Sequence, residues 1–244
     1  MKILALDSSG LVASVAYLED DKIKGLININ YQKTYSQTLL PMLNEMVKTL
    51  EINLDELDCL ACANGPGSFT GLRIGVATIK GLGLSLNKKI VDVSTLEALA
   101  LNWPGADGIV CPIMDARRLQ VYAAAFSFKD GSPKPEEVIE PVNCEMIKLI
   151  ERLNALGRKV YFTGDGVPVY RELIEQNLKV AHVLPNAANA YQNAANVAVL
   201  GNIYAKEGLA KNAADISPIY LRKPQAERER EEMEAAGRAN SPNT

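Results

Sequence analysis

The order of the predicted secondary-structure elements occurs twice along this chain of 244 residues. In the first half, three strand-like segments (residues 2–7, 13–19 and 22–31) precede a helix, a strand and a helix (37–50, 57–63 and 70–86). The second half repeats this order with strands at 109–114, 120–128 and 137–140, a helix at 143–156, a strand at 159–163 and a helix at 167–177. Two successive units of this kind predict a duplicated α/β architecture, with a three-strand meander in each unit.

The joins between these units predict the domain organisation. A short strand at 90–93 leads to a helix that begins with a capping box from Ser94 to Glu97. We predict an N-terminal lobe (1–104), a C-terminal lobe (105–190) and a segment (191–222) whose long helix, 191–206, packs back on the lobes. This plan resembles the actin-like ATPase and ribonuclease H-like folds. Residues 223–244 form a charged tail without an apolar face, for which we expect disorder or a solvated helix.

Composition excludes several classes of protein. The net charge of −3 argues against a chain that binds nucleic acid alone through a broad basic face. No apolar run approaches the ~18 residues of a membrane span, and Met1-Lys2 leads directly into a strand pattern without a signal-type start. Four cysteines without framework spacing predict a reducing, cytoplasmic setting.

The cysteine pair and the single histidine do not indicate a metal or redox site. Cys59 and Cys62 form a CxxC motif inside a strand-like segment, where residues three apart face opposite sides of a sheet, so we expect buried structural thiols. His182 is the only histidine, and no carboxylate cluster flanks it. A histidine-based zinc site or a Ser-His-Asp triad is therefore disfavoured, and we expect no metal.

A glycine-rich run at residues 64–75 lies between a predicted strand and a predicted helix, a layout that can present backbone N–H groups to an anion. A first phosphate loop would be Asp7-Ser8-Ser9-Gly10, but the matching loop after Asp115 reads Ala116-Arg117-Arg118 and has no glycine. The turn Gly164-Asp165-Gly166 fits an adenosine-side loop and a plain turn equally well. We therefore expect no cofactor and keep a weak anion or nucleotide site as an alternative. Its residues would be Asp7, Ser8, Ser9, Gly67 and Ser68.

Two predicted helices in the first half carry more apolar surface than one core-facing stripe needs. In helix 37–50, which contains Pro41, the apolar residues could all pack between sheet and neighbouring helix, or the Met42/Met46 edge could face a partner. Helix 70–86 is apolar almost all round its axis, and its glycines suggest a close approach by another helix. We therefore expect part of its burial to come from a second subunit.

Five motifs in this order carry a family resemblance. They are Ile3-Leu4-Ala5-Leu6-Asp7-Ser8-Ser9, Ser36-Gln37-Thr38-Leu39-Leu40-Pro41-Met42, the run from Gly65 to Gly75, Ser94-Thr95-Leu96-Glu97-Ala98-Leu99, and Asp115-Ala116-Arg117-Arg118. Together they resemble the bacterial TsaB (YeaZ) family of tRNA threonylcarbamoyladenosine biosynthesis, and Ser217-Pro218-Ile219-Tyr220-Leu221-Arg222 is similar to its C-terminal signature. The resemblance spans about residues 2–222.

The resemblance implies a non-catalytic subunit that pairs with the TsaD transferase through the N-terminal lobe helices, with TsaE joining the pair. This assembly transfers a threonylcarbamoyl group to N6 of adenosine 37 in tRNAs that read codons starting with A. It also implies a homodimer when TsaD is absent. The catalytic relative carries an HxxxH metal motif where this chain has Tyr35 and Leu39 at the two ends. The implied partner surface comprises Leu39, Leu40, Met42, Leu43, Met46, Val47, Leu72, Arg73, Val76, Ile79 and Lys80.

The residues leave three questions open. Arg73 could tie its helix to loop carbonyls or to a carboxylate such as Asp7, or it could reach nucleotide or tRNA. Arg117 and Arg118 could contact tRNA phosphate or form a solvated pair. Two alternative functions also stand, an autonomous ATP-binding kinase of the actin-like fold and a metal-independent peptidase. The missing second phosphate loop opposes the first, and the lack of a nucleophile–base pair opposes the second.

Overall fold

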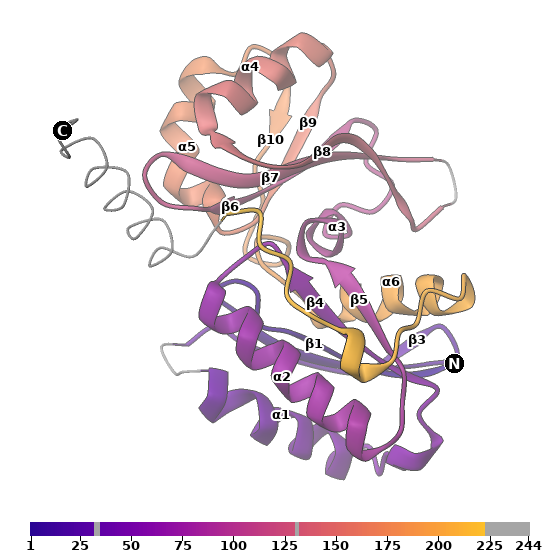
Figure 1. Ribbon diagram of the computed structural model, residues 1–244. Helices are drawn as coiled ribbons and strands as arrows, with labels where there is room; N and C mark the ends of the chain where they lie inside the picture. Colours follow the sequence, from indigo (N-terminus) through magenta and orange to yellow (C-terminus); the bar gives the residue numbers. More distant parts are fainter. Residues whose placement is uncertain (32–34, 130–131, 223–244) are drawn as a thin grey trace, which may run out of the picture.

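A computed structural model describes residues 1–31, 35–129 and 132–222. The N-terminal lobe is built on a five-stranded sheet with the order β3-β2-β1-β4-β5. Its strands are β1 (Lys2–Asp7), β2 (Ala13–Glu19), β3 (Lys22–Ile29), β4 (Cys59–Gly65) and β5 (Ile90–Ser94). The first three pair antiparallel, and β4 and β5 extend the sheet in parallel to β1. The predicted meander is therefore present in this lobe (Figure 1).

The C-terminal lobe repeats this topology with the sheet order β10-β9-β6-β7-β8. Its strands are β6 (Ile109–Asp115), β7 (Gln120–Phe128), β8 (Pro135–Glu145), β9 (Val160–Thr163) and β10 (His182–Val183). β6, β7 and β8 pair antiparallel, and β9 and β10 continue from β6 in parallel. The duplicated actin-like fold expected from the order of elements is thus confirmed.

Helices cover both faces of the N-terminal sheet. α1 (Tyr35–Thr49) and α2 (Phe69–Ser85) pack on one face over the largest apolar cluster, and α6 (Ala194–Lys206) covers the other face. α3 (Thr95–Ala100) packs against the C-terminal sheet and lies between the lobes (Figure 1). α4 (Met146–Leu156) and α5 (Gly166–Asn177) cover the outer face of that second sheet.

Some predicted boundaries are wrong. The third strand of the second lobe runs over Pro135–Glu145 rather than 137–140, so Asn143 lies in the strand and caps no helix. α1 begins at Tyr35 rather than at Gln37, and Pro41 lies in its second turn. α6 begins at Ala194, where the side chain of Asn193 accepts a hydrogen bond from the N–H of Ala195. The pairing of β8 with β7 and the cap of Asn193 decide two of these ends, and such contacts leave a weak signal in the sequence.

The chain leaves α6 as a strap, here defined as residues 211–222, that crosses back over the N-terminal lobe toward the second lobe (Figure 1). Lys211 bridges to the edge strand through Ile90, and the ammonium of Lys80 on α2 donates to the carbonyls of Ala214 and Ile216. No helix in the described part of the chain is long and apolar enough to cross a membrane.

Candidate functional site

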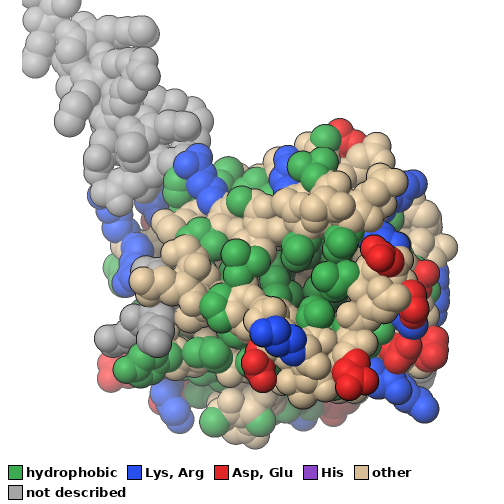
Figure 2. All heavy atoms as spheres, turned by 90° about the horizontal axis from the view of Figure 1, so that it is seen from below, with side chains coloured by type: hydrophobic (Ala, Val, Ile, Leu, Met, Phe, Trp, Pro, Cys, Tyr) green, Lys and Arg blue, Asp and Glu red, His purple; other side chains and the backbone are tan. Residues whose placement is uncertain are grey.

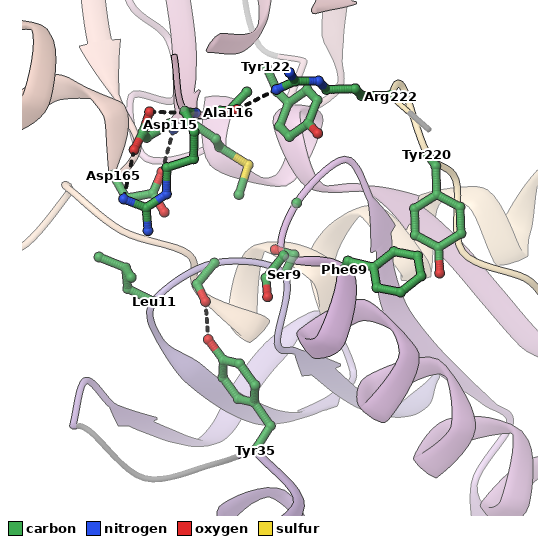
Figure 3. Close-up of a pocket in the computed structure, with 15 residues that line it drawn as sticks. Ser9, Leu11, Tyr35, Phe69, Asp115, Ala116, Tyr122, Asp165, Tyr220 and Arg222 are labelled. Atoms are coloured by element: carbon green, nitrogen blue, oxygen red, sulfur yellow. Dashed lines mark hydrogen bonds and ion pairs between the residues drawn. The ribbon is translucent and has the colours of Figure 1, made fainter. Parts of the chain in front are cut away.

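A cleft of about 440 Å³ opens between the lobes where the carboxyl ends of β1 and β6 face each other. The first lobe contributes the loop after Asp7, the start of α2 and Tyr35, and the strap contributes Tyr220 and Arg222 (Figure 3). From the second lobe come Asp115, Ala116, Arg117, Tyr122 and Asp165. Four aromatic rings and both signs of charge line this cleft, and sequence reasoning had singled out none of the four rings as cleft residues.

The Asp7 loop is closed on itself. One carboxylate oxygen of Asp7 accepts hydrogen bonds from the N–H and the hydroxyl of Ser9, at 2.8 and 2.6 Å. Asp7 is fully buried, and this burial raises the pKa of its carboxyl group to about 6. Ser9 is fully buried as well, so its hydroxyl cannot reach a substrate even though it lies beside a carboxylate.

Atoms of the chain itself occupy the space beside the glycine run (residues 64–75) where an anion would bind. The carbonyl of Ser9 accepts a hydrogen bond from the N–H of Ser68 at 2.7 Å and occupies the space that a Cβ on Gly67 would need. The N–H of Gly71 is taken by the hydroxyl of Ser68, which caps α2. Because these N–H groups have internal acceptors and Asp7 brings a carboxylate close by, the fold opposes the weak anion site predicted at Asp7, Ser8, Ser9, Gly67 and Ser68.

The glycines of α2 also serve the interior of this chain. A Cβ on Gly75 would collide with the hydroxyl of Ser8, and one on Gly71 would collide with the carbonyl of the same residue. Gly83 packs against Ile90 and Ala213. The expected approach of another helix at these notches is therefore wrong for Gly75 and Gly83, because the end of β1 and the strap fill them. Gly81 differs from Gly71, Gly75 and Gly83, because no atom lies within 4 Å of the position that a Cβ would take there.

On the opposite wall of the cleft, Asp115 and Asp165 lie together. One oxygen of Asp165 accepts a hydrogen bond of 3.3 Å from the N–H of Asp115, whose own carboxylate accepts from the N–H of Arg117 and from the hydroxyl of Tyr170. Burial, with a smaller contribution from the charge of Asp115, raises the pKa of Asp165 to about 6. The guanidinium of Arg117 lies 3.6 Å from Asp115 and is mostly exposed. The turn at Gly164 to Gly166 therefore places the carboxylate of Asp165 beside Asp115 on this wall.

Aromatic and arginine side chains form a clasp between α2 and the strap, made of Phe69, Arg73 and Tyr220. The guanidinium carbon of Arg73 lies 3.9 Å from the centroid of the Phe69 ring, and this ring stacks at 5.0 Å on that of Tyr220. Arg222 then reaches the second lobe and donates to the carbonyl of Ala116 at 2.8 Å (Figure 3). The sequence left open whether Arg73 would meet loop carbonyls, a carboxylate such as Asp7, or nucleotide or tRNA. Within the chain its hydrogen-bond partner is Tyr220 of the strap.

Most of the residues assigned to a partner surface lie in the chain's own core. Seven of the eleven are buried: Leu39, Met42, Leu43, Met46, Leu72, Val76 and Ile79. The idea that the Met42/Met46 edge faces a partner is therefore wrong, because the sheet and α2 cover it. Likewise α2 is not buried on every side within this chain, since Leu84 is 65% exposed.

The exposed side of α1 and α2 retains an apolar surface. Leu40 is 56% exposed on α1, and Ala77, Gly81 and Leu84 follow one another at helical spacing on α2. Val47 and Lys80 are half-buried at its edge, and Arg73 is exposed. Figure 2 looks onto this side of the lobe, where apolar side chains lie between charged ones at the periphery. We refer to Leu40, Ala77, Gly81 and Leu84 as the helix face.

The cysteine pair expected to have a structural role is buried in the apolar clusters of the first lobe. Cys59 and Cys62 are buried free thiols that belong to apolar clusters on opposite faces of the sheet, as predicted. Burial raises the pKa of the Cys59 thiol to about 11. His182 packs edge-on to Phe162 in the second lobe, away from the cleft residues. Among the described residues, no group of three or more histidine, cysteine or carboxylate side chains could hold a metal ion.

The sequence and the fold match those of characterised proteins. The family model described as "TsaD: tRNA N6-adenosine threonylcarbamoyltransferase" matches residues 12–230. A Bacillus subtilis protein named "tRNA threonylcarbamoyladenosine biosynthesis protein TsaB" is 33% identical over 93% of this chain and 96% of its own length. A protein of the same name from Haemophilus influenzae is 31% identical over 91% of this chain and 94% of its own. The crystal structure "YeaZ from Pseudomonas aeruginosa" has the same fold, with a TM-score of 0.77 and 24% identity over 90% of this chain and 99% of that one.

Proposed function

The chain belongs to the TsaB (YeaZ) family of tRNA threonylcarbamoyladenosine biosynthesis proteins, and we propose from this premise that it is a non-catalytic subunit which binds and supports TsaD. In that assembly TsaD would transfer the threonylcarbamoyl group to N6 of adenosine 37, and TsaE would join the pair. This chain would work in the cytoplasm, and it would form a homodimer through the same surface when TsaD is absent.

The chemistry of the cleft supports a role other than catalysis. The two positions that correspond to the metal-binding histidines of the TsaD-type motif hold Tyr35 and Leu39. The hydroxyl of Tyr35 donates to the carbonyl of Gly10, and Leu39 is buried in the apolar cluster under α1. Leu39 has no donor atom for a metal ion. Burial raises the pKa of the Tyr35 phenol to about 12, so the phenolate that could bind a metal does not form at neutral pH.

The helix face is the observation that carries the proposal. Leucines that are 56% and 65% exposed lie on two adjacent helices, and exposed apolar side chains of this size are typical of interaction surfaces. Gly81 offers no side chain, so the backbone of a partner helix could approach α2 closely there. The clasp and Lys80 fix α2 to the strap, which keeps this surface rigid before binding.

Reconstitution tests the proposal directly. The chain mixed with cognate TsaD, TsaE and tRNA should be required for threonylcarbamoyladenosine formation, and it should be inactive without TsaD. Leu84→Glu should abolish co-purification with TsaD while the circular dichroism spectrum stays unchanged. Val169→Glu is the matched control, because Val169 is 58% exposed on α5 of the other lobe. Full modification in the absence of this chain, or equal loss for both variants, would overturn the proposal.

A further inference from the structure

The two lobes are joined by an apolar contact at α3. Leu96 and Leu99 of this helix belong to one buried cluster with Val110 and Phe126 of the second sheet. Hydrophobic attraction is strong in sum but has no preferred direction, so such a contact resists separation of the lobes more than a small rotation between them. The joint, here defined as α3 and the residues that it packs against, therefore holds the lobes together and leaves the angle between them to other contacts.

Polar contacts at the end of α3 belong to the same joint. The amide of Asn102 donates to the hydroxyl of Thr163 at 3.0 Å, and the indole of Trp103 donates to the carbonyl of Phe162 at 2.9 Å. Because these atoms lie next to the apolar cluster, a rotation about α3 moves them only a short way. They place the axis of such a rotation at α3 and β9.

Two polar contacts join the lobes away from this joint. At the cleft, the guanidinium of Arg222 donates to the carbonyl of Ala116 at 2.8 Å (Figure 3). At the other contact, the ammonium of Lys134 donates to both carboxylate oxygens of Glu207 at 2.8 Å and lies 5.1 Å from the centroid of the Tyr204 ring. In Figure 1 the end of the strap and the β7–β8 hairpin reach the neighbouring lobe on opposite sides of α3. The two contacts are therefore placed to limit rotation in opposite senses.

The strap itself belongs to the first lobe. The N–H of Ile219 donates to the carbonyl of Asn64 at 2.7 Å, and a Cβ on Gly65 would collide with the carbonyl of Ile219. Among the hydrogen bonds of the strap within the described residues, the one that reaches the second lobe is that of Arg222. A single hydrogen bond contributes far less than a buried apolar cluster, so this contact can break while the joint stays intact.

We propose that the strap acts as a latch on the cleft, through the hydrogen bond between Arg222 and the carbonyl of Ala116. With this bond formed, the lobes keep the angle seen in this structure. With it broken, they rotate apart about α3 and widen the cleft. Tyr122 and Asp165, which line the second-lobe wall, then become more accessible to a ligand. The latch is a property of the isolated chain and does not rest on its pairing with TsaD.

Double electron–electron resonance on the full chain measures the proposed opening. One spin label is placed on α1 at Gln37→Cys and the other on α5 at Val169→Cys, two exposed positions on different lobes. Cys144→Ser removes the half-buried native thiol, and the remaining three cysteines are buried. The labelled parent should give one narrow distance distribution, which corresponds to the latched state.

Variants test which contact sets the angle. Arg222→Ala should add a population at longer distance and raise the ratio of open to latched molecules at least about tenfold, as expected for the loss of a hydrogen bond from a charged donor. Lys134→Ala breaks the contact on the other side of α3 and should not lengthen the distance between these labels. Arg171→Ala removes an exposed arginine of α5 and is the matched control. An unchanged distribution in Arg222→Ala, or equal lengthening in either of the other variants, would overturn the proposal.

Trp103 distinguishes release of the latch from damage to the joint. It is the only tryptophan of the chain, and its ring centroid lies 5.2 Å from that of Tyr161. Its fluorescence emission should be the same in Arg222→Ala and in the parent, because the joint stays packed. A shifted emission that accompanies the longer distance would mean that the joint, not the latch, had been lost, and the proposal would fail.

Discussion

The Nε atom of Arg73 donates a hydrogen bond of 3.3 Å to the hydroxyl of Tyr220, which lies 147 residues further along the chain. This contact joins α2, which carries three of the four residues of the helix face, to the strap that ends at the second lobe. The strap is held at further points by the N–H of Ile219, which donates to the carbonyl of Asn64, and by Arg222. The surface proposed for the partner and the cleft between the lobes are therefore linked by one stretch of chain.

The clasp should contribute to stability. We expect Tyr220→Ala to lower the free energy of unfolding by about 1–2 kcal/mol. The substitution removes the stacking of Tyr220 on Phe69 and exposes the Phe69 ring, which also contacts the guanidinium of Arg73. Urea unfolding followed by circular dichroism measures this. Tyr31→Ala, at a tyrosine that is 70% exposed, is the control, and an equal effect of the two variants would contradict a stabilising clasp.

Stability should fall as the pH rises from about 4 to 6. The pKa of Asp7 is about 6 in the folded chain against an ordinary value of 3.8, so the native state holds a proton that the unfolded chain has already lost in this window. Above pH 6 the native state carries a buried charge. Asp7→Asn should therefore raise the free energy of unfolding at pH 7.5 by about 1–3 kcal/mol and change it little at pH 4.

Urea titrations of Asp7→Asn at the two pH values check this difference. Part of the slope should remain in the variant, because burial also raises the pKa of Asp165 to about 6. Glu172→Gln, at an exposed position of α5, is the control for a carboxyl-to-amide change. A stability gain at pH 4 as large as that at pH 7.5 would contradict a titrating Asp7.

Two glycines of α2 should respond in opposite ways to alanine. Gly75→Ala should destabilise the chain by about 1–3 kcal/mol, because the new methyl group would collide with the hydroxyl of Ser8. Gly81→Ala meets open space and should stabilise it by up to about 1 kcal/mol through helix propensity. Thermal unfolding of the pair measures both effects, and a loss at Gly81 would mean that another part of the molecule fills that space.

Charged substitutions on α1 should separate core from surface. Met46→Asp should prevent folding, because Met46 is 2% exposed and the carboxylate would have no partner in the apolar cluster. Leu40→Asp, at an exposed position less than two turns earlier, should leave the fold intact and weaken the assembly with TsaD. Size-exclusion chromatography and near-ultraviolet circular dichroism distinguish the outcomes. A folded Met46→Asp variant would place this residue outside the core.

The cleft should not bind Mg-ATP in the isolated chain. The N–H groups of Ser9 and Ser68 already have acceptors, and two aspartates, Asp115 and Asp165, line the cleft and would repel phosphates. Titration calorimetry should detect no heat of binding at nucleotide concentrations up to about 1 mM. Saturable binding would revive the kinase alternative.

The amino-acid pattern was sufficient to predict the order of the elements, the duplication and the family. Hydrophobic periodicity and turn residues are local signals, and they located β1, β4 and α2 within a residue or two. The opposite facing of Cys59 and Cys62 also followed from strand geometry alone, and so did their burial.

What covers each apolar surface became clear from the packing of the folded chain. The helical pattern predicts that Met42 and Met46 are buried, but it does not indicate whether they pack against a sheet of the same chain or against a second subunit. The glycine run is ambiguous in the same way. The space left by a missing Cβ could be filled by a bound anion or by a carbonyl of the same chain. Here the carbonyl of Ser9 and the hydroxyl of Ser8 fill it, and the strap returns from 147 residues away to place Tyr220 beside Arg73. Contacts between residues so far apart depend on the path of the whole chain, which no local pattern records.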